Sequence, residues 1–202
     1  MSENIDKIIY INLEKRSDRK KEIEEELNNF NLPFERFEAI ETSGFGILGC
    51  GKSHLAVLKL AKERGYKNIL ILEDDFTFTV SKEKFENNLS HFFSENIDYD
   101  VCMISYYLNN YVDSKYDFLY KVLDGQTASG YIVNEKYYDK LIDLYEYAMP
   151  LLETTREHWN YANDQIWKKL QPNDNWYSFI EKIGKQRASY SDNSESFQDY
   201  NI

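Results

Sequence analysis

The stretch from residue 68 to residue 75 constrains the fold of this chain more than any other. It has the sequence NILILEDD, an aliphatic run that ends in three carboxylates. A short aliphatic run bounded by charge is typical of a strand buried on both faces of a largely parallel sheet. The sequence therefore predicts an α/β fold in which Glu73, Asp74 and Asp75 lie at the carboxyl end of a core strand, where such sheets open their ligand crevice.

Two interpretations of these acids are open at this point. Clustered carboxylates repel one another and raise each other's pKa unless a cation or hydrogen-bond donors offset the repulsion. A hard divalent ion with oxygen ligands is one natural offset, and such an ion is commonly shared with a substrate phosphate. The alternative is a solvated acidic turn after a core strand.

Length and charge limit the function classes. The 202 residues fit one domain, and no repeat or linker divides them. We predict a single domain over residues 1–202, with a polar tail from about residue 193 that is expected to be partly disordered. The formal net charge of −11 argues against nucleic-acid binding, because phosphate affinity needs clustered Lys and Arg. An anionic substrate would therefore need a local basic pocket or a metal ion.

The sequence carries no pattern of secretion or membrane insertion. Its first residues lack the basic and then apolar order of a signal peptide, and no apolar run is long enough to span a bilayer. Cys50 and Cys102 are the only cysteines, without the paired spacing of a metal site, and they are compatible with a reducing compartment. We expect a cytoplasmic protein without a transmembrane segment.

Alternating strand and helix patterns support the α/β class. Apolar runs predict strands over residues 7–13, 34–40, 68–72, 99–107, 116–123 and 126–133, and residues 176–183 form a last apolar segment. Helical spacing predicts helices over residues 17–30, 52–64, 82–93, 135–148 and 160–170. We expect Ser17 to cap the first helix, Gly65 to end the second and Pro150 to close the fourth. A turn is expected at Gly125, a loop over 41–49 and a surface loop or mobile lid over 109–117.

Residues 46–53 have the sequence GILGCGKS and satisfy the phosphate-loop pattern G-x-x-x-x-G-K-S. In such a loop the backbone N–H groups wrap the phosphates, Lys52 would reach the outer ones and Ser53 would hold Mg²⁺. The loop should follow a buried strand directly, however, and residues 41–45 are polar and irregular. A phosphate-loop kinase or NTPase is therefore an alternative that the context disfavours.

Four segments of the sequence together indicate a protein family. They are INLEKRSDR at 11–19, GCGKSH at 49–54, LEDD at 72–75 and ASGYIV at 128–133. In this order they resemble the family 25 glycosyltransferases, which include bacterial lipooligosaccharide glycosyltransferases and collagen-modifying galactosyltransferases. The resemblance spans about residues 7–192, and the segment at 49–54 is the most diagnostic. The phosphate-loop match is then a coincidence, because Gly51 and Lys52 fall where the family varies. The family positions in this segment are Gly49, Cys50, Ser53 and His54.

The resemblance implies a glycosyltransferase A-type, Rossmann-like fold with a mixed, mostly parallel sheet flanked by helices. It also implies a nucleotide-sugar donor, expected to be UDP-linked, a Mn²⁺ or Mg²⁺ ion, and inversion at the anomeric carbon. Asp75 is the first candidate metal ligand and Glu73 the second, and Asp192 in a late Ser-Asp pair completes the metal or donor site. Asp74 is expected to contact the ribose or the sugar.

Other candidate donor contacts lie in several parts of the chain. The segment after the first strand offers Asn12, Leu13, Arg16 and Arg19, and the two arginines would supply positive charge for a diphosphate. Further candidates are Ser53, His54, Gln126, Ser129 and Gln165. For Arg19 a solvated helix turn, and for His54 a structural role in the core, are equally open.

An inverting transfer needs a base for the acceptor hydroxyl, and the resemblance indicates Asp164. Relatives carry an acid at the start of a late helix, and a helix N-terminus lowers the pKa of a carboxylate, which keeps it charged. The same position suits a simple capping residue. We therefore expect a metal-dependent inverting glycosyltransferase that moves a hexose to a hydroxyl of a glycan or of a hydroxylated protein side chain. A non-catalytic sugar-binding module of the same fold is the second alternative.

Overall fold

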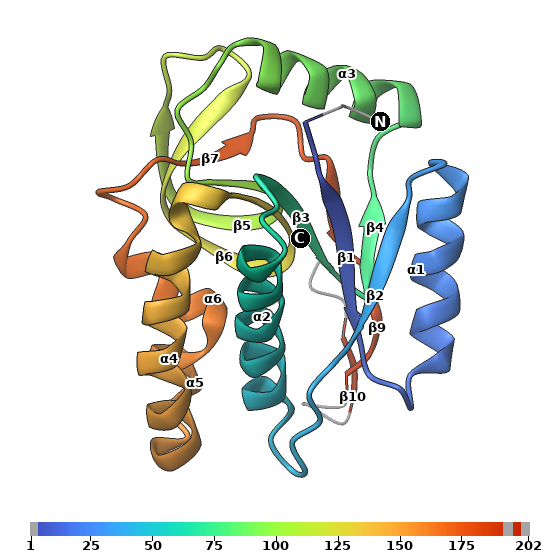
Figure 1. Cartoon of the computed structure of the whole chain (residues 1–202), viewed down its shortest axis with the longest axis vertical. Helices are drawn as coiled ribbons and strands as arrows, with labels where there is room; N and C mark the ends of the chain where they lie inside the picture. The colour runs from blue at the N-terminus through green and yellow to red at the C-terminus, as the bar shows by residue number, and fades with distance from the viewer. Residues whose placement is uncertain (1–3, 192–195, 199–202) are drawn as a thin grey trace.

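A six-stranded sheet forms the middle of the structure (Figure 1). The computed structural model describes residues 4–191 and 196–198. The strands of this sheet lie in the order β2-β1-β3-β6-β5-β7. Their bounds are β1 Lys7–Asn12, β2 Phe34–Glu38, β3 Asn68–Glu73, β5 Val101–Asp113, β6 Leu119–Asn134 and β7 Trp176–Phe179.

Strand β6 runs against the other strands of this sheet. β1 pairs in parallel with β2 and β3, and β5 pairs in parallel with β7, whereas β6 is antiparallel to β3, β5 and β7. The sheet is therefore mixed but mostly parallel, which confirms the prediction. β3 lies between β1 and β6, and the aliphatic run from Ile69 to Leu72 is completely buried.

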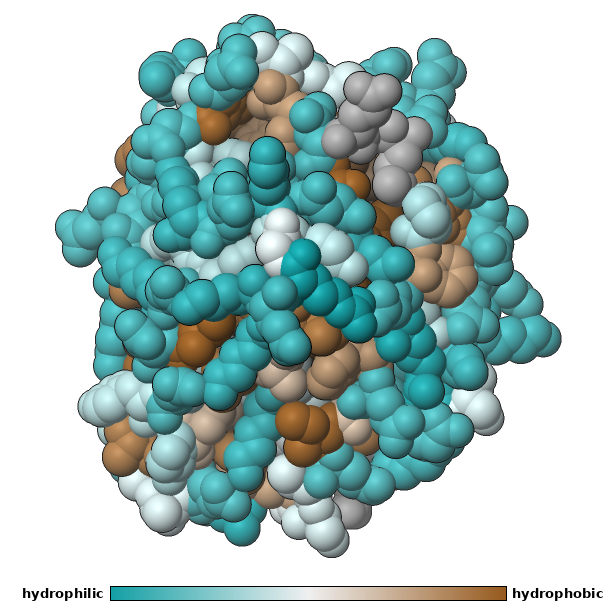
Figure 2. All heavy atoms as spheres, viewed as in Figure 1, coloured by the Kyte–Doolittle hydropathy of each residue, from teal (hydrophilic) through white to brown (hydrophobic). Residues whose placement is uncertain are grey.

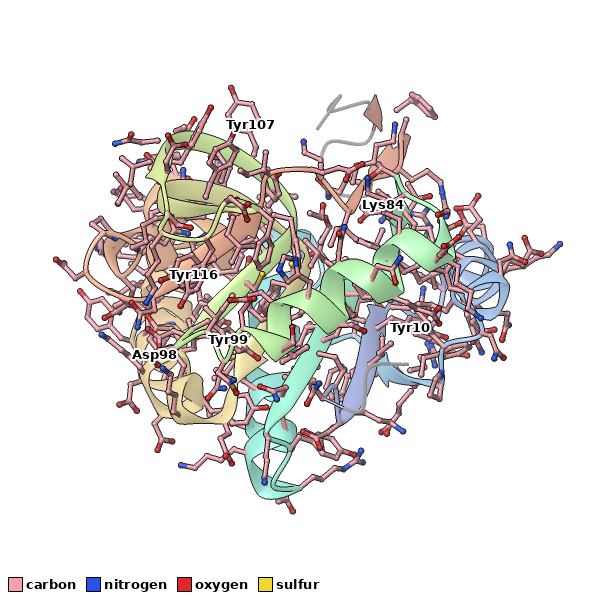
Figure 3. The ribbon with its side chains drawn as sticks, turned by 90° about the horizontal axis from the view of Figure 1, so that it is seen from above. Tyr10, Lys84, Asp98, Tyr99, Tyr107 and Tyr116 are labelled. Carbon is pink, nitrogen blue, oxygen red and sulfur yellow. The ribbon has the colours of Figure 1, made fainter. Side chains whose placement is uncertain are left out.

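Helices cover both faces of the sheet. α2 (Gly46–Glu63) and α4 (Tyr138–Thr155) pack on one face, while α1 (Ser17–Asn29) and α3 (Lys82–Ser94) pack on the other (Figure 1). Alternate residues of a strand enter the two layers. Ile71 joins the core under α2 and α4, whereas Leu72 joins the core under α1 and α3. Figure 3 shows α3 running across the sheet, with Lys84 near its start and Tyr99 beyond its end.

Short elements complete the fold around the ends of the core strands. β4 (Phe76–Phe78) pairs with β8 (Gly184–Gln186), and β9 (Ser189–Ser191) pairs with β10 (Ser196–Gln198). The remaining helical turns are η1 (Glu135–Tyr137), α5 (His158–Tyr161), α6 (Asn163–Ile166) and η2 (Trp167–Lys169). The β4–β8 pair brings a late segment beside the acids, since the Arg187 N–H donates to the Asp75 carbonyl oxygen at 2.6 Å.

The surface visible in Figure 2 is mostly hydrophilic, with scattered apolar residues. Within residues 4–191 and 196–198, no helix is both long and apolar enough to cross a membrane. Cys50 and Cys102 are both free thiols.

Helix α2 begins at Gly46, well before the expected start, so the last part of the predicted loop, residues 46–49, is helical. A Cβ atom on Gly49 would lie 2.4 Å from the Ile40 carbonyl oxygen, and one on Gly51 would lie 2.5 Å from the Met149 sulfur. Gly49 therefore lets α2 pack closely against the segment that contains Ile40, and Gly51 lets it pack closely against α4. Neither glycine is needed for a turn.

Other helix boundaries differ less from the prediction. α1 and α3 occupy the expected ranges, and Gly65 follows α2 with a left-handed φ of +67°. Ser17 does not cap α1, because Arg16 takes the N-cap position without a capping side-chain bond. α4 continues through Pro150, so the Glu146 carbonyl loses its usual N–H partner, and both Glu146 and Pro150 are exposed residues.

Strands β5 and β6 form a longer ribbon than the sequence predicts. The predicted loop at 109–117 continues β5 as far as Asp113, and β6 passes through Gly125 without a turn. Register shifts mark bulges, for example between Ser105 and Tyr107. The outer half of β5 is largely exposed, with Tyr107 pointing outward in Figure 3, so the burial pattern that identifies a strand is missing there.

The predicted helix at 160–170 is broken into separate turns. α5 ends before Ala162, whose backbone is extended at φ −58° and ψ 149°, and α6 starts at Asn163. The buried Trp167 side chain donates from its indole N–H to the Gly125 carbonyl oxygen at 2.9 Å, which ties this region to β6. Tertiary contact therefore overrides the helical spacing of the sequence.

The close approach at Gly49 generates a stability prediction. Gly49→Ala should lower the free energy of unfolding by about 1–3 kcal/mol, because the new methyl group meets a backbone carbonyl that cannot rotate away. Lys52→Ala is the matched control on the same helix. It removes an exposed ion pair with Glu153 and should change stability by less than about 0.5 kcal/mol. Urea unfolding of both variants measures the difference, and equal stabilities would contradict the prediction.

Candidate functional site

Strand alternation sends the acids after β3 toward different neighbours. Glu73 lies two residues after Ile71, on the same face of β3, and its side chain points toward α2, where it contacts His54. Asp74 lies two residues after Leu72, and its side chain points toward α1, where it contacts Arg19. The three acids therefore lie together at the end of β3, with Glu73 paired to α2 and both Asp74 and Asp75 in contact with Arg19.

Asp74 is held by groups from β1 and α1. Its carboxylate accepts from Asn12 Nδ2 at 2.8 Å and from Arg19 Nη1 at 3.0 Å. Burial raises the pKa of Asp74, and Arg19 and Asn12 offset only part of that rise. Asn12 is itself fully engaged, because Nδ2 also donates to the Arg16 carbonyl oxygen and Oδ1 accepts from Arg36 Nε at 3.0 Å. The Asn12 side chain thus positions Asp74.

The buried carboxylate of Asp75 has fewer hydrogen-bond donors than it needs. It is 8% exposed, and Oδ2 lies 3.3 Å from both Gln186 Nε2 and Arg19 Nη1. Its Oδ1 atom is buried and has no hydrogen-bond partner among the described residues. Burial and the neighbouring Glu73 raise the pKa of Asp75 to about 8, although Arg19 acts in the opposite direction. A buried carboxylate oxygen without a donor is costly, and a cation would remove that cost.

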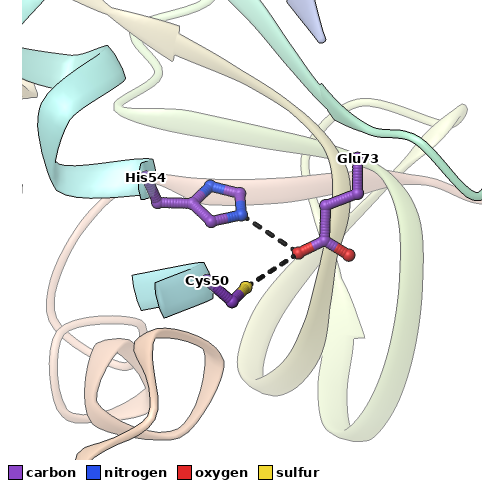
Figure 4. A group of neighbouring side chains, drawn as sticks. All are labelled: Cys50, His54 and Glu73. Atoms are coloured by element: carbon purple, nitrogen blue, oxygen red, sulfur yellow. Dashed lines mark hydrogen bonds and ion pairs between the residues drawn. The ribbon is translucent and has the colours of Figure 1, made fainter. Parts of the chain in front are cut away.

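Glu73 accepts two hydrogen bonds in a partly buried cluster with Cys50 and His54 (Figure 4). Its Oε1 accepts from His54 Nε2 at 3.0 Å and from Cys50 Sγ at 3.3 Å. Burial acts to raise the pKa of Glu73, but the bonds from His54 and Cys50 outweigh it, so the pKa is lowered. Tyr131 Oη lies 2.7 Å from His54 Nδ1, and burial raises the Tyr131 pKa strongly. Tyr131 therefore keeps its proton. Because the Glu73 carboxylate can only accept, His54 Nε2 carries a hydrogen, and Tyr131 can donate to Nδ1 of this tautomer.

Asp164 lies nearby, in the single turn of α6. Its Oδ2 accepts from the Thr127 N–H and its Oδ1 from Gln165 Nε2, both at 3.2 Å. Burial raises the pKa of Asp164, so the predicted lowering by a helix dipole is wrong. The reason is that one helical turn carries too small a dipole to offset desolvation. Thr127 has a φ of +81°, a strained value for a β-branched residue, and its N–H is directed at this carboxylate.

The two groups of acids are electrostatically connected. Glu73 contributes to the raised pKa of Asp164, after burial and the opposing hydrogen bonds from Thr127 and Gln165. The pKa of the Cys50 thiol is raised well above its usual value by burial, then by Glu73, and further by Asp164 and Asp75. The carboxylates after β3 and the carboxylate of α6 are therefore close enough for their charges to influence one another.

The other predicted site residues are placed as follows. Ser53 Oγ donates to the Gly49 carbonyl oxygen at 2.7 Å and accepts from the Ile40 N–H at 2.8 Å, and Ser129 Oγ lies 2.5 Å from Ser105 Oγ. Both hydroxyls are buried and have structural partners.

Gln126 accepts from Lys168 Nζ at 2.7 Å. Arg16 donates to both carboxylate oxygens of Asp18, and its hydrogen bond lowers the pKa of Asp18 to about 2. Leu13 is half-buried beside this segment. Asp192 lies outside the described residues.

Sequence reasoning missed several residues of this site. Cys50 lies one helical turn before His54, a spacing that could have indicated their shared face. Arg36 is a charged residue within the short strand β2, which is a weak signal. Gln186 and Tyr131 reach the acids only through tertiary pairing, so no local pattern indicates them.

Residues 46–53 do not form a phosphate loop in this structure. They belong to α2, so their backbone N–H groups are directed along the helix and do not converge on a phosphate. Lys52 pairs with Glu153 at 3.0 Å on the surface, and the Ser53 hydroxyl is engaged inside the protein. The phosphate-loop interpretation therefore lacks the geometry that it needs.

Comparison with known proteins bears on the fold. No family model and no curated protein matches the sequence. The structure is similar to that of a glycosyltransferase involved in the glycosylation of the major capsid of PBCV-1, with a TM-score of 0.52 and 12% identity over 85% of this chain and 80% of that one.

Two further solved structures are similar to this one, with lower TM-scores. A197 from STIV has a TM-score of 0.47 and 13% identity over 96% of this chain and 95% of that one. The galactosyltransferase LgtC in complex with donor and acceptor sugar analogs has a TM-score of 0.45 and 12% identity over 84% and 72%. At such identities likeness shows the fold alone. The predicted glycosyltransferase A-type fold is confirmed, and membership of family 25 stays a prediction.

Asp75 generates a prediction for the metal-free protein. Because its folded pKa of about 8 exceeds the unfolded value of about 3.9, its contribution to stability is complete below pH ~4 and is lost as the pH rises toward 8. Asp75→Asn should therefore match the parent near pH 4 and unfold at a higher temperature at pH 8, by ~2–4 °C for each kcal/mol recovered.

Thermal unfolding in the presence of a chelator measures this effect. Asp18→Asn is the control, because the pKa of Asp18 is lowered and neutralising it should give no gain at pH 8. An Asp75→Asn protein that is less stable than the parent at pH 8 would mean that the Asp75 carboxylate is already compensated.

Proposed function

We propose that this chain is a divalent-cation-dependent, inverting glycosyltransferase. It moves a hexose from a nucleotide-diphosphate sugar, UDP-linked, to a hydroxyl of a glycan or of a hydroxylated amino-acid side chain. The observation that carries the proposal is the buried Asp75 Oδ1, which has no partner among the described residues and lies in a carboxylate cluster at the end of the central strand. The glycosyltransferase A-type fold agrees with it.

The carboxylates fit a hard cation such as Mn²⁺ or Mg²⁺, which prefers oxygen ligands. Asp75 is the proposed first ligand and Glu73 the second, through an oxygen other than the one that accepts from His54 and Cys50. Asp192 is the proposed third ligand. When bound, the ion would stabilise the negative charge that develops on the leaving diphosphate.

The donor is proposed to lie over the loop between β1 and α1. Asn12 and Arg19 fix the Asp74 carboxylate, which then accepts from a hydroxyl of the ribose or the sugar. Arg16 in this loop and Arg19 in the first turn of α1 carry positive charge, which a diphosphate needs on a chain of net charge −11. Leu13 would provide an apolar contact.

The acceptor hydroxyl is proposed to lie next to Asp164. The Thr127 N–H and Gln165 hold its two carboxylate oxygens, so the orientation of the base is fixed before the acceptor binds. Asp164 takes the hydroxyl proton as the new bond to the anomeric carbon forms and the bond to the diphosphate oxygen breaks. The raised pKa makes Asp164 a stronger base than an ordinary carboxylate once it is deprotonated.

Donor binding tests the metal assignment. Mn²⁺ and a UDP-sugar together should raise the unfolding temperature, because a ligand of the native state stabilises it. Asp75→Ala should abolish the Mn²⁺-dependent part of the shift, whereas Lys52→Ala should keep it. Loss of ATP binding in Lys52→Ala, with Mn²⁺-dependent donor binding intact in Asp75→Ala, would support a phosphate-loop enzyme instead. Failure to release UDP with any donor and acceptor would indicate a non-catalytic sugar-binding module.

The base assignment predicts a selective loss of turnover. Asp164→Asn should lower kcat by ~10²-fold or more with donor affinity nearly unchanged, because only proton removal in the transition state is affected. In the parent, kcat should rise with pH through a pKa above the usual Asp range, and this dependence should disappear in the variant. Asp143→Asn on the exposed side of α4 is the control. Normal kcat in Asp164→Asn would remove Asp164 from the mechanism.

A further inference from the structure

Cys50, His54 and Glu73 bring together three side chains that bind transition metals (Figure 4). One potential ligand atom from each lies within 4.8 Å of the other two. Glu73 Oε1 is 3.0 Å from His54 Nε2 and 3.3 Å from Cys50 Sγ. In a tetrahedral zinc site with bonds of about 2.0–2.3 Å, neighbouring ligand atoms lie about 3.3–3.7 Å apart. Two of the three separations are therefore within a few tenths of an ångström of those of a metal site.

We propose that Cys50, His54 and Glu73 bind a Zn²⁺ ion at a second cation site, chemically different from the one at Asp75. Thiolate and imidazole ligands select Zn²⁺ over Mn²⁺ and Mg²⁺, which prefer oxygen. Asp75 offers carboxylate oxygens, and its hydrogen-bond partners Arg19 and Gln186 add no thiol or imidazole, whereas α2 supplies the Cys50 thiol and the His54 imidazole. The end of β3 thus separates a hard-ion site from a soft-ion site, with Glu73 between them.

The two ligands from α2 are held in place before an ion binds. Cys50 and His54 are four residues apart on one helix, so both project from the same face, as paired histidines do in helical zinc sites. His54 is completely buried, and Tyr131 Oη lies 2.7 Å from its Nδ1 atom. A hydrogen bond to the second ring nitrogen is the usual device that orients a metal-binding histidine. The His54 ring therefore has its Nε2 atom fixed toward Glu73.

Binding requires a defined movement of protons. The Cys50 thiol loses its proton to solvent and the thiolate binds the ion. His54 Nε2 must offer a lone pair, so the ring hydrogen moves to Nδ1, which then donates to the Tyr131 oxygen. Glu73 is already a carboxylate and releases nothing. Zn²⁺ binding should therefore release about one proton per ion.

A fourth position is available next to Asn163. This residue is 4% exposed, its Oδ1 lies 3.9 Å from Cys50 Sγ, and its Nδ2 is buried without a hydrogen-bond partner in the described part of the chain. An unpartnered amide donor is unusual at such burial. It is suited to donate to a water molecule or hydroxide that completes the tetrahedron around the ion.

Cobalt substitution tests the site without depending on activity. Co²⁺ added to the purified, reduced protein should give a thiolate-to-cobalt charge-transfer band, which added Zn²⁺ removes. Cys50→Ser should abolish the band while keeping a hydroxyl donor for Glu73, and Cys102→Ala, which removes the other free thiol, should leave it intact. Tyr131→Phe should keep the band but weaken Zn²⁺ affinity by about 10–100-fold, because the orienting bond is lost.

The outcomes separate this inference from the proposed function. Asp75→Asn should retain the cobalt band, since Asp75 is not a ligand of the second site, even if it abolishes Mn²⁺-dependent donor binding. A parent protein without the charge-transfer band, or a Cys50→Ser protein that keeps it, would overturn the zinc proposal and leave the glycosyltransferase proposal untouched. Zn²⁺ binding with no proton release would equally overturn it, because Cys50 would then not be a ligand.

Discussion

Burial of carboxylates at the end of β3 is the constraint on which the rest of the site depends. Burial raises the pKa of both Asp74 and Asp75, so each needs a donor or a proton to be tolerated. Asn12 and Arg19 compensate Asp74, while Asp75 keeps a buried oxygen without a partner among the described residues. A fold that leaves one carboxylate incompletely compensated gives up stability at a position where a cation would restore it.

The two-residue period of β3 gives the neighbouring acids different chemical surroundings. Glu73 lies on the face covered by α2 and meets His54 and Cys50. Asp74 lies on the opposite face and meets Arg19 from α1. The third acid follows in the turn before β4. Because successive side chains of a strand point to opposite faces, Glu73 meets a thiol and an imidazole from α2, whereas Asp74 and Asp75 share the Arg19 guanidinium from α1.

The errors of the sequence predictions have identifiable physical causes. Gly49 and Gly51 resemble loop residues, yet they lie in α2 because their missing side chains admit Ile40 and Met149. The outer half of β5 resembles a loop because exposure removes the apolar alternation. The pKa of Asp164 was misjudged because the expected long helix is a single turn and burial dominates. In each case contacts between distant segments outweigh a local preference.

By itself the sequence determined the α/β class, the central strand predicted at residues 68–72 and the clustering of acids at its end, because aliphatic runs and helical spacing are local patterns. The order of the strands, the α2 start and the partner of each acid were decided only by the tertiary structure. His54, Arg19 and Gln186 come from distant parts of the chain and converge on consecutive residues. Electrostatic compensation depends on distances of a few ångströms, which no spacing along the chain specifies.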